Sequence, residues 1–311
     1  GTRRYLVQKD DNFSAVTSPV VQDLGKVDMG DYKNVIDFAN WAKTNYPAKK
    51  YMLILWNHGA GWVKSRAAET KGISYDDETG HHLNTPQMGL VLKEIGGVDV
   101  YGSDACLMQM PEVDYEIKDY TQYIVGSEET EPGDGYTYNT FLGPIIANPA
   151  MTAEELGKQA VNAYADHYAG QSATQSLLKP SAFDGFVPLV NDFVAAAISA
   201  NEKTLVKSAR DKAQKYAYAD NKDMYDFLKL YEESSASQDV KAKSARVREY
   251  LSGTLVVHNR TSGKYAGKSM GLAVYLPSSA LNGAYNELAW SKVTQWDEFI
   301  SWYLTKDEAG S

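Results

Sequence analysis

Short apolar runs that end in turn residues alternate with helical patterns over the first half of the chain. The three runs cover residues 51–56, 98–101 and 123–125. Segments in which apolar residues recur every three or four positions cover residues 35–42, before the first run, and residues 88–95 and 107–120, between the runs. Short buried runs that alternate with amphipathic segments are typical of a parallel sheet covered by helices on both faces. We therefore predict an α/β fold with a mostly parallel sheet for residues 1–148.

The second half of the chain has mainly helical patterns. Thr152 and Glu155 form a capping box at the start of one helix. Further helices are predicted over residues 193–219, 224–236 and 295–303, and a pair of strands over residues 253–257 and 270–276. We expect residues 149–311 to form a mainly helical region, with this strand pair, packed on the sheet of the first half.

Two of the apolar runs end beside reactive side chains. The first runs into His58 and Gly59, and the second runs into Asp104 and Cys106, the only cysteine of the chain. Because the carboxyl ends of parallel strands meet at one edge of a sheet, we expect the imidazole and the thiol to lie together. A cysteine attacks as thiolate and needs an imidazole or a helix N-terminus nearby, so we also expect Cys106 near the start of the helix over residues 107–120. The alternative is an inert cysteine in the core.

The charge balance limits the class of partner. The chain has 31 basic and 40 acidic residues and a net charge of −9, which disfavours nucleic acid and favours cationic partners. The apolar run over residues 51–56 is far shorter than the roughly 20 residues that span a bilayer, so we predict no membrane span.

Motifs of other chemistries are weak or missing. The sequence has no phosphate loop and no dinucleotide fingerprint. The acidic triplet at residues 76–78 is either a solvated turn or part of a calcium site, and a calcium site needs six or more oxygen ligands. We assign no metal ligands.

Four segments of the chain resemble the clostripain family of cysteine peptidases, which belongs to the caspase-like group. They are LILWNHGAGW, SDACLMQMPEVDYEI, VGSEETEPGDGYTY and MGLAVYLP. The resemblance implies a caspase-like α/β/α sandwich in which Cys106 is the nucleophile and His58 the general acid and base. The backbone N–H groups of Gly59 and Cys106 would form the oxyanion hole. Because the family usually has an earlier strand and helix, we expect this chain to be a truncated or processed form.

The resemblance also implies a specificity for basic residues, since family members cut after Arg and some also after Lys. Asp104 matches the acid that lines the primary specificity pocket, and we expect Asp134 as its second wall. A guanidinium presents five donors in a rigid fork, which suits such carboxylates. The alternatives are that Asp104 caps the following helix and that Asp134 is a turn residue between two glycines.

The polar segment over residues 63–71 follows the candidate histidine closely and is typical of a surface loop. It contains Lys64, Arg66 and Lys71. An Arg/Lys-specific enzyme with such a loop is a substrate for itself, and family members mature by internal cuts. We prefer the Arg66–Ala67 bond, with Lys64–Ser65 and Lys71–Gly72 as alternatives.

The expected substrates are proteins or peptides with Arg or Lys before the cut, and the expected form is a monomer or a self-cleaved two-chain species. We expect the chemistry to require no cofactor and keep calcium as a candidate structural or activating ion, because the resemblance implies that some relatives need it. We expect a secreted, periplasmic or cell-surface protein. The alternative function is a catalytically silent relative that serves as a surface binding or scaffold protein.

Overall fold

A computed structural model describes residues 1–12, 14–62 and 72–305 of the chain. The strands are β1 (Thr2–Tyr5), β2 (Val20–Gly25), β3 (Met52–Trp56), β4 (Val98–Asp104), β5 (Thr121–Gly126), β6 (Thr174–Leu178), β7 (Asn221–Asp223), β8 (Val256–Thr261) and β9 (Ala273–Tyr275). The helices are α1 (Tyr32–Asn45), α2 (Thr85–Glu94), α3 (Pro111–Ile117), α4 (Tyr138–Ala147), α5 (Ala153–His167), α6 (Phe183–Ala200), α7 (Lys203–Lys212), α8 (Met224–Ser234), α9 (Gln238–Tyr250), α10 (Ala289–Val293) and α11 (Trp296–Leu304). The short helical turns are Pro180–Ala182, Leu251–Leu255, Gly263–Tyr265 and Gly283–Glu287.

The main sheet is mixed and has the strand order β3-β4-β5-β6-β8. Strands β3, β4 and β5 are parallel, as the first half of the sequence predicts, whereas β6 and β8 join the sheet antiparallel. The predicted pairing of the two late strands is wrong. Strand β8 pairs with β6, because the Lys179 N–H donates to the Leu255 carbonyl and aligns the two strands, and β9 pairs with β7.

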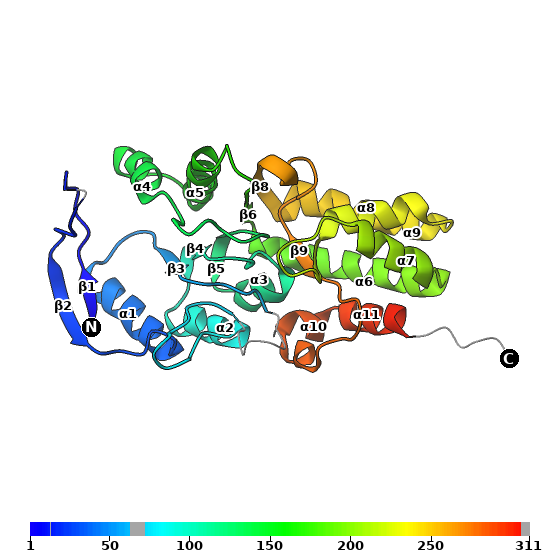
Figure 1. The fold of residues 1–311 in the computed structure, drawn as a ribbon, viewed down its shortest axis with the longest axis horizontal. Helices are drawn as coiled ribbons and strands as arrows, with labels where there is room; N and C mark the ends of the chain where they lie inside the picture. The colour runs from blue at the N-terminus through cyan, green and yellow to red at the C-terminus, as the bar shows by residue number, and fades with distance from the viewer. Residues whose placement is uncertain (13, 63–71, 306–311) are drawn as a thin grey trace.

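Helices cover both faces of this sheet (Figure 1). Neighbouring strand residues alternate between two cores, because successive side chains of a strand point to opposite faces. Val100 and Val125 pack with residues of α4 and α5, whereas Tyr101 and Ile124 pack with residues of α2, α3 and α6. The fold is therefore an α/β/α sandwich of the kind that the sequence predicts.

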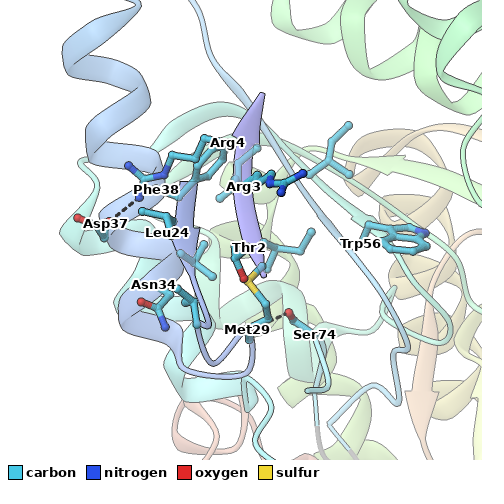
Figure 2. Close-up of a pocket in the computed structure, with 15 residues that line it drawn as sticks. Thr2, Arg3, Arg4, Leu24, Met29, Asn34, Asp37, Phe38, Trp56 and Ser74 are labelled. Carbon is cyan, nitrogen blue, oxygen red and sulfur yellow. Dashed lines mark hydrogen bonds and ion pairs between the residues drawn. The ribbon is translucent and has the colours of Figure 1, made fainter. Parts of the chain in front are cut away.

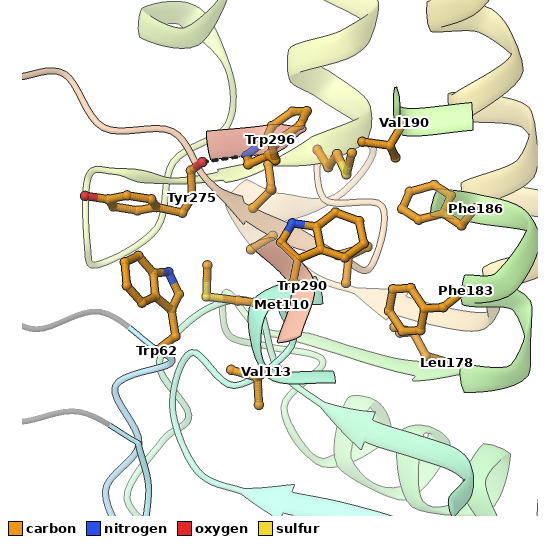
Figure 3. Close-up of a cluster of buried hydrophobic side chains, with 14 of the residues drawn as sticks. Trp62, Met110, Val113, Leu178, Phe183, Phe186, Val190, Tyr275, Trp290 and Trp296 are labelled. Atoms are coloured by element: carbon orange, nitrogen blue, oxygen red, sulfur yellow. Dashed lines mark hydrogen bonds between the residues drawn. The ribbon is translucent and has the colours of Figure 1, made fainter. Parts of the chain in front are cut away.

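The C-terminal helices share a core with the sheet-bearing half (Figure 3). Trp290 lies beside Phe183 and Phe186 of α6, with ring centroids 6.1 and 6.3 Å apart. The Trp296 indole donates to the Tyr275 carbonyl at 3.0 Å, and the Tyr275 ring meets the edge of Trp62. Trp62 closely follows the candidate histidine, so the same aromatic cluster supports that turn.

The predicted long helix over residues 193–219 is two helices. Helix α6 ends at Asn201, whose left-handed backbone (φ 54°) closes the last turn, and α7 follows. Within the described residues, the segment Pro180–Ala200 is long and apolar enough to cross a membrane by length and composition alone. Its residues Phe183, Phe186 and Val190 are buried in the core, as in the core helix of a globular protein.

Strands β1 and β2 form an antiparallel hairpin that is separate from the main sheet. Between this hairpin, α1 and β3 lies a cavity of about 240 Å³ (Figure 2). Arg4 forms an ion pair with Asp37 on its wall and stacks on Trp41. Trp56, at the end of β3, lines this cavity and also the candidate active site.

Candidate active site

The register of β3 and β4 places the two candidate residues at the same sheet edge. Trp56, the last residue of β3, is the parallel partner of Asp104, the last residue of β4. The Asn57 N–H continues the pairing with a 3.4 Å hydrogen bond to the Asp104 carbonyl. His58 and Cys106 each lie two residues beyond this last strand pair.

The side chains of His58 and Cys106 line one cavity of about 350 Å³. The cavity is lined by Trp56, Asn57, His58, Asp77, Asp104, Ala105, Cys106, Glu131, Pro132, Gly133 and Gly135. Trp56 is 64% exposed, and the His58 side chain is also exposed. The sequence expectation that thiol, imidazole and the Asp104 carboxyl share one edge agrees with this arrangement.

The turn after β3 requires glycine. The Asn57 Oδ1 accepts the His58 N–H at 2.5 Å, which fixes the start of the turn. Gly59 then passes so close to Cys106 that a Cβ atom on it would lie 2.4 Å from the Cys106 carbonyl oxygen and 3.0 Å from its nitrogen. The backbones of the two residues assigned to the oxyanion hole are therefore in direct contact.

Cys106 does not lie at a helix start, so that expectation is wrong. Helix α3 begins only at Pro111, because the chain after Cys106 first takes a left-handed turn at Leu107 (φ 64°). There the Leu107 N–H donates to the Glu129 carbonyl, and the Gln109 N–H to the Ser127 carbonyl. The partner of the thiol is instead the Glu131 backbone, whose N–H donates to the Cys106 Sγ at 3.3 Å.

Asp104 is buried, with 2% of its surface exposed, and it does not cap a helix. Its Oδ1 accepts the Tyr136 N–H at 3.0 Å, and its Oδ2 accepts the Tyr138 hydroxyl at 2.8 Å. Burial raises the pKa of the Asp104 carboxyl, and the hydrogen bonds from Tyr138 and Tyr136 partly offset this effect. These two donors hold a carboxyl group rigidly in the cavity wall.

Gly135 makes this arrangement possible. Its backbone is left-handed (φ 62°), and a Cβ atom on it would lie 2.6 Å from the Asp104 Oδ1. A side chain there would take the space beside the carboxyl group. The Gly135 carbonyl in turn accepts the Tyr168 hydroxyl at 2.7 Å, which fixes the turn from the side of α5.

The carboxyl beside Asp104 in the cavity is that of Glu131, a residue that no sequence pattern indicated. Asp134, the expected second wall, is exposed and does not line the cavity, although Gly133 and Gly135 on either side of it do. Glu131 lies in the same acidic turn, within hydrogen-bonding reach of the Asp104 carboxyl. Burial raises the pKa of Glu131 well above its usual range, and the charge of Asp104 raises it further.

The residues of the predicted cleavage sites, Lys64, Arg66, Ala67 and Lys71, lie outside the described residues. The acidic triplet does not resemble a cation site. The Asp76 carboxylate accepts the backbone N–H groups of Met29, Glu78 and Thr79. In residues 1–12, 14–62 and 72–305, no three His, Cys, Asp or Glu side chains cluster as metal ligands would.

Comparisons with known proteins agree with the resemblance seen in the sequence. One curated relative, clostripain from Hathewaya histolytica, is 30% identical over 142 residues, which is 42% of this chain and 27% of that protein. The chain thus matches only about a quarter of the length of this relative.

Two solved structures have the same fold. A secreted C11 cysteine protease from Bacteroides thetaiotaomicron, in complex with an irreversible peptide inhibitor, superimposes with a TM-score of 0.71 at 19% identity, over 94% of this chain and 84% of that chain. An inactive zymogen C11 protease from Parabacteroides distasonis has a TM-score of 0.66 at 19% identity, over 89% and 80%. The sequence model of the clostripain family matches residues 3–303. The chain belongs to the clostripain family.

Proposed function

We propose that the protein is a cysteine endopeptidase that cleaves peptide bonds after Arg, and also after Lys, with Cys106 and His58 as its catalytic residues. The observation that carries the proposal is the cavity that Cys106, His58 and the buried Asp104 line together. A nucleophile, a base and a fixed anion in one cavity are what hydrolysis after a basic residue requires.

The chemistry follows from these groups. His58 takes the proton of the Cys106 thiol, and the sulfur attacks the carbonyl carbon of the scissile bond. The C–N bond of the tetrahedral intermediate then breaks, and the leaving amine takes the proton from His58. Water, deprotonated by His58, hydrolyses the resulting thioester and restores the thiol.

The oxyanion of the intermediate needs preorganised donors. The backbone N–H groups of Gly59 and Cys106 are the proposed donors, and the contact between these two backbones supports this role. Removal of one such donor typically costs about 3 kcal/mol of transition-state stabilisation.

Asp104 is the proposed acceptor for the basic side chain of the substrate. Its carboxylate is held in place by Tyr136 and Tyr138, so it loses little conformational entropy when a guanidinium binds. Hydrogen bonds between ionised partners are stronger than neutral ones, which explains a preference for Arg.

Self-cleavage after Arg66 is the proposed route to the active form, with the bonds after Lys64 and Lys71 as alternatives. Basic residues that follow His58 closely in the sequence support this step, and the zymogen among the similar structures is compatible with it. An extracellular location is proposed because one similar structure is of a secreted protease.

A panel of fluorogenic peptides with Arg, Lys, Asp or Phe before the cut tests the reaction and its specificity. Measurements with and without a chelator test whether calcium is needed. We expect cleavage of the Arg and Lys peptides and labelling of Cys106 by an arginyl chloromethyl ketone. A folded protein that neither cleaves nor reacts would support the catalytically silent alternative.

A further inference from the structure

Glu131 is a half-buried residue whose carboxyl group the proposed chemistry does not use. It lines the cavity beside Asp104 and Cys106. Its Oε1 accepts a long hydrogen bond of 3.4 Å from the Gln175 side chain. Its Oε2 is buried, and no donor among the described residues reaches it. A buried carboxylate oxygen without a donor is costly, so this carboxyl either holds a proton or accepts a donor that a ligand brings.

Because Glu131 lies next to Asp104, only one of the two carboxyl groups is ionised when the cavity is empty. Two adjacent buried carboxyl groups do not both ionise without a cation, so they share a proton. The Asp104 oxygens each accept a donor from the protein, whereas Glu131 lacks strong partners. Glu131 is therefore the carboxyl that holds the proton when the cavity is empty, which agrees with the raised pKa of Glu131.

The tyrosines around Glu131 do not supply this proton. The titratable side chains that face it or line the same cavity are Asp104, Cys106, Tyr136, Tyr138, Tyr164, Tyr168, His58 and Asp77. Burial raises the pKa of all four tyrosines, so their hydroxyl groups stay protonated near neutral pH. The shared proton of Asp104 and Glu131 is therefore not one that these tyrosines exchange near neutral pH.

We propose that Glu131 is a specificity-determining residue that forms, with Asp104, a two-carboxylate receptor for the guanidinium group of the substrate. Binding of the guanidinium releases the shared proton to solvent, so that one cation replaces one proton. The five donors of a guanidinium are enough to reach both carboxylates at once. This inference rests on the proposed function, because it places the arginine side chain of the substrate in this cavity.

The first test compares matched peptides with Arg and with norleucine before the cut. The Glu131→Gln variant keeps the shape of the side chain, and its amide donates to Asp104 as the protonated acid does. It removes the negative charge that Glu131 would carry when a guanidinium is bound. We expect the ratio of kcat/KM for Arg over norleucine to fall by at least about tenfold, as for the loss of one charged partner from a buried site. Glu249→Gln, an exposed change on α9, is the control and should keep the ratio of the wild type.

Two results would overturn the inference. One is an unchanged ratio in Glu131→Gln while Asp134→Asn lowers it, which would make Asp134 the second acid. The other is an equal fall for both peptides, which would mean that Glu131 only supports the fold or the nucleophile.

The second test measures the number of protons released when a guanidinium compound binds, and it does not depend on catalysis. Calorimetric titration of the wild type with agmatine, a small guanidinium compound, is repeated at pH 7 in buffers of different ionisation enthalpy. We expect release of about one proton per agmatine from the wild type and close to none from Glu131→Gln. If agmatine binds the wild type without proton release, or does not bind at all, the two-carboxylate receptor is rejected. This result needs only the wild type, so it holds even if Glu131→Gln fails to fold.

The two tests separate this inference from the proposed function. Agmatine binding with Glu131-dependent proton release, in a protein that cleaves no peptide, would leave the receptor standing and reject the peptidase. If the wild type cleaves after Arg and the ratio of kcat/KM for Arg over norleucine is unchanged in Glu131→Gln, the peptidase proposal stands and the two-carboxylate receptor is rejected.

Discussion

The backbone N–H of Glu131 donates to the Cys106 Sγ at 3.3 Å. One residue therefore contacts the Cys106 sulfur with its backbone and the Asp104 carboxyl with its side chain. An N–H aimed at the sulfur is a suitable partner for a thiolate. In the proposed mechanism, a basic side chain bound at Glu131 would lie next to the sulfur that attacks the carbonyl carbon of the same residue.

Removal of either proposed catalytic residue should abolish the proposed peptidase activity. We expect Cys106→Ala and His58→Ala each to lower kcat/KM for an Arg peptide by more than about 100-fold, because the two groups act as a unit. The His58 side chain is exposed, so its loss should leave the melting temperature close to that of the wild type. A variant that keeps more than about a hundredth of the activity, with an unchanged melting temperature, would disprove the role of that residue.

Neutralising Asp104 should weaken recognition of Arg. We expect Asp104→Asn to lower kcat/KM for an Arg peptide by more than tenfold, since a desolvated guanidinium loses a charged acceptor worth about 2 kcal/mol. Asp134→Asn should have a smaller effect, because Asp134 is exposed and outside the cavity. Matched Arg and norleucine peptides measure the difference. An equal loss on both would indicate that Asp104 only anchors Tyr136 and Tyr138.

The placement of His58 and Cys106 at one edge could be predicted from the sequence, because each follows an apolar run and parallel strands end on the same side. The start of α3 was harder to place. The apolar spacing of Met110, Val113 and Ile117 predicts a helix, but it does not show where the helix begins. Pro111, a residue favoured in the first turn, was the available signal.

The second carboxyl could not be chosen from the sequence. Glu128, Glu129 and Glu131 lie in one acidic turn and have the same chemistry. Contacts with residues far along the chain separate them, since Tyr216 binds Glu128 and Tyr265 binds Glu129. Only Glu131 of the three lines the cavity. The pairing of the strands predicted over residues 253–257 and 270–276 was wrong for a similar reason. Their actual partners, β6 and β7, are set by tertiary packing.

Two glycines of the cavity should respond differently to substitution by alanine. A Cβ on Gly135 would lie 2.6 Å from the Asp104 Oδ1, at a left-handed position, whereas a Cβ on Gly133 would meet nothing within 4 Å. We expect Gly135→Ala to lower kcat/KM for Arg peptides by more than about tenfold and stability by about 1 kcal/mol, and Gly133→Ala to change both little. Kinetics and thermal melts of the two variants measure this. Equal effects would contradict the close approach at Gly135.

Self-cleavage should depend on the nucleophile. After incubation, the wild-type protein should give two chains of about 7 and 27 kDa. The two chains should stay associated, because β3 remains hydrogen-bonded to β4 after cleavage of the Arg66–Ala67 bond. Cys106→Ala should stay whole, and Arg66→Ala should shift the cut to Lys64 or Lys71. Mass spectrometry under denaturing and native conditions resolves the products. An active wild type that remains a single chain would reject self-cleavage without affecting the peptidase proposal.

Glu112, at the start of α3, is a buried acid whose charge affects stability. Its Oε1 accepts the Tyr275 N–H at 3.1 Å and the Tyr285 hydroxyl at 2.9 Å, while its Oε2 is buried and has no partner in the part of the chain that the structure describes. Burial raises the pKa of Glu112 from 4.5 to about 7. The folded protein thus holds this proton more tightly than the unfolded chain does. The stability that the protonated acid contributes is full below pH 4.5 and is lost as the pH rises towards about 7.

Replacing Glu112 by Gln should therefore flatten the pH dependence of stability between pH 4.5 and 7. The amide oxygen can take the place of Oε1 and accept both hydrogen bonds, and no charge then develops in the core. We expect the variant to become more stable relative to the wild type as the pH rises through this range. The free energy of unfolding of the variant minus that of the wild type should increase by up to about 3 kcal/mol. Urea denaturation at several pH values measures it, with the exposed Glu249→Gln as control. If the curves of Glu112→Gln and wild type run parallel, Glu112 does not titrate in this window.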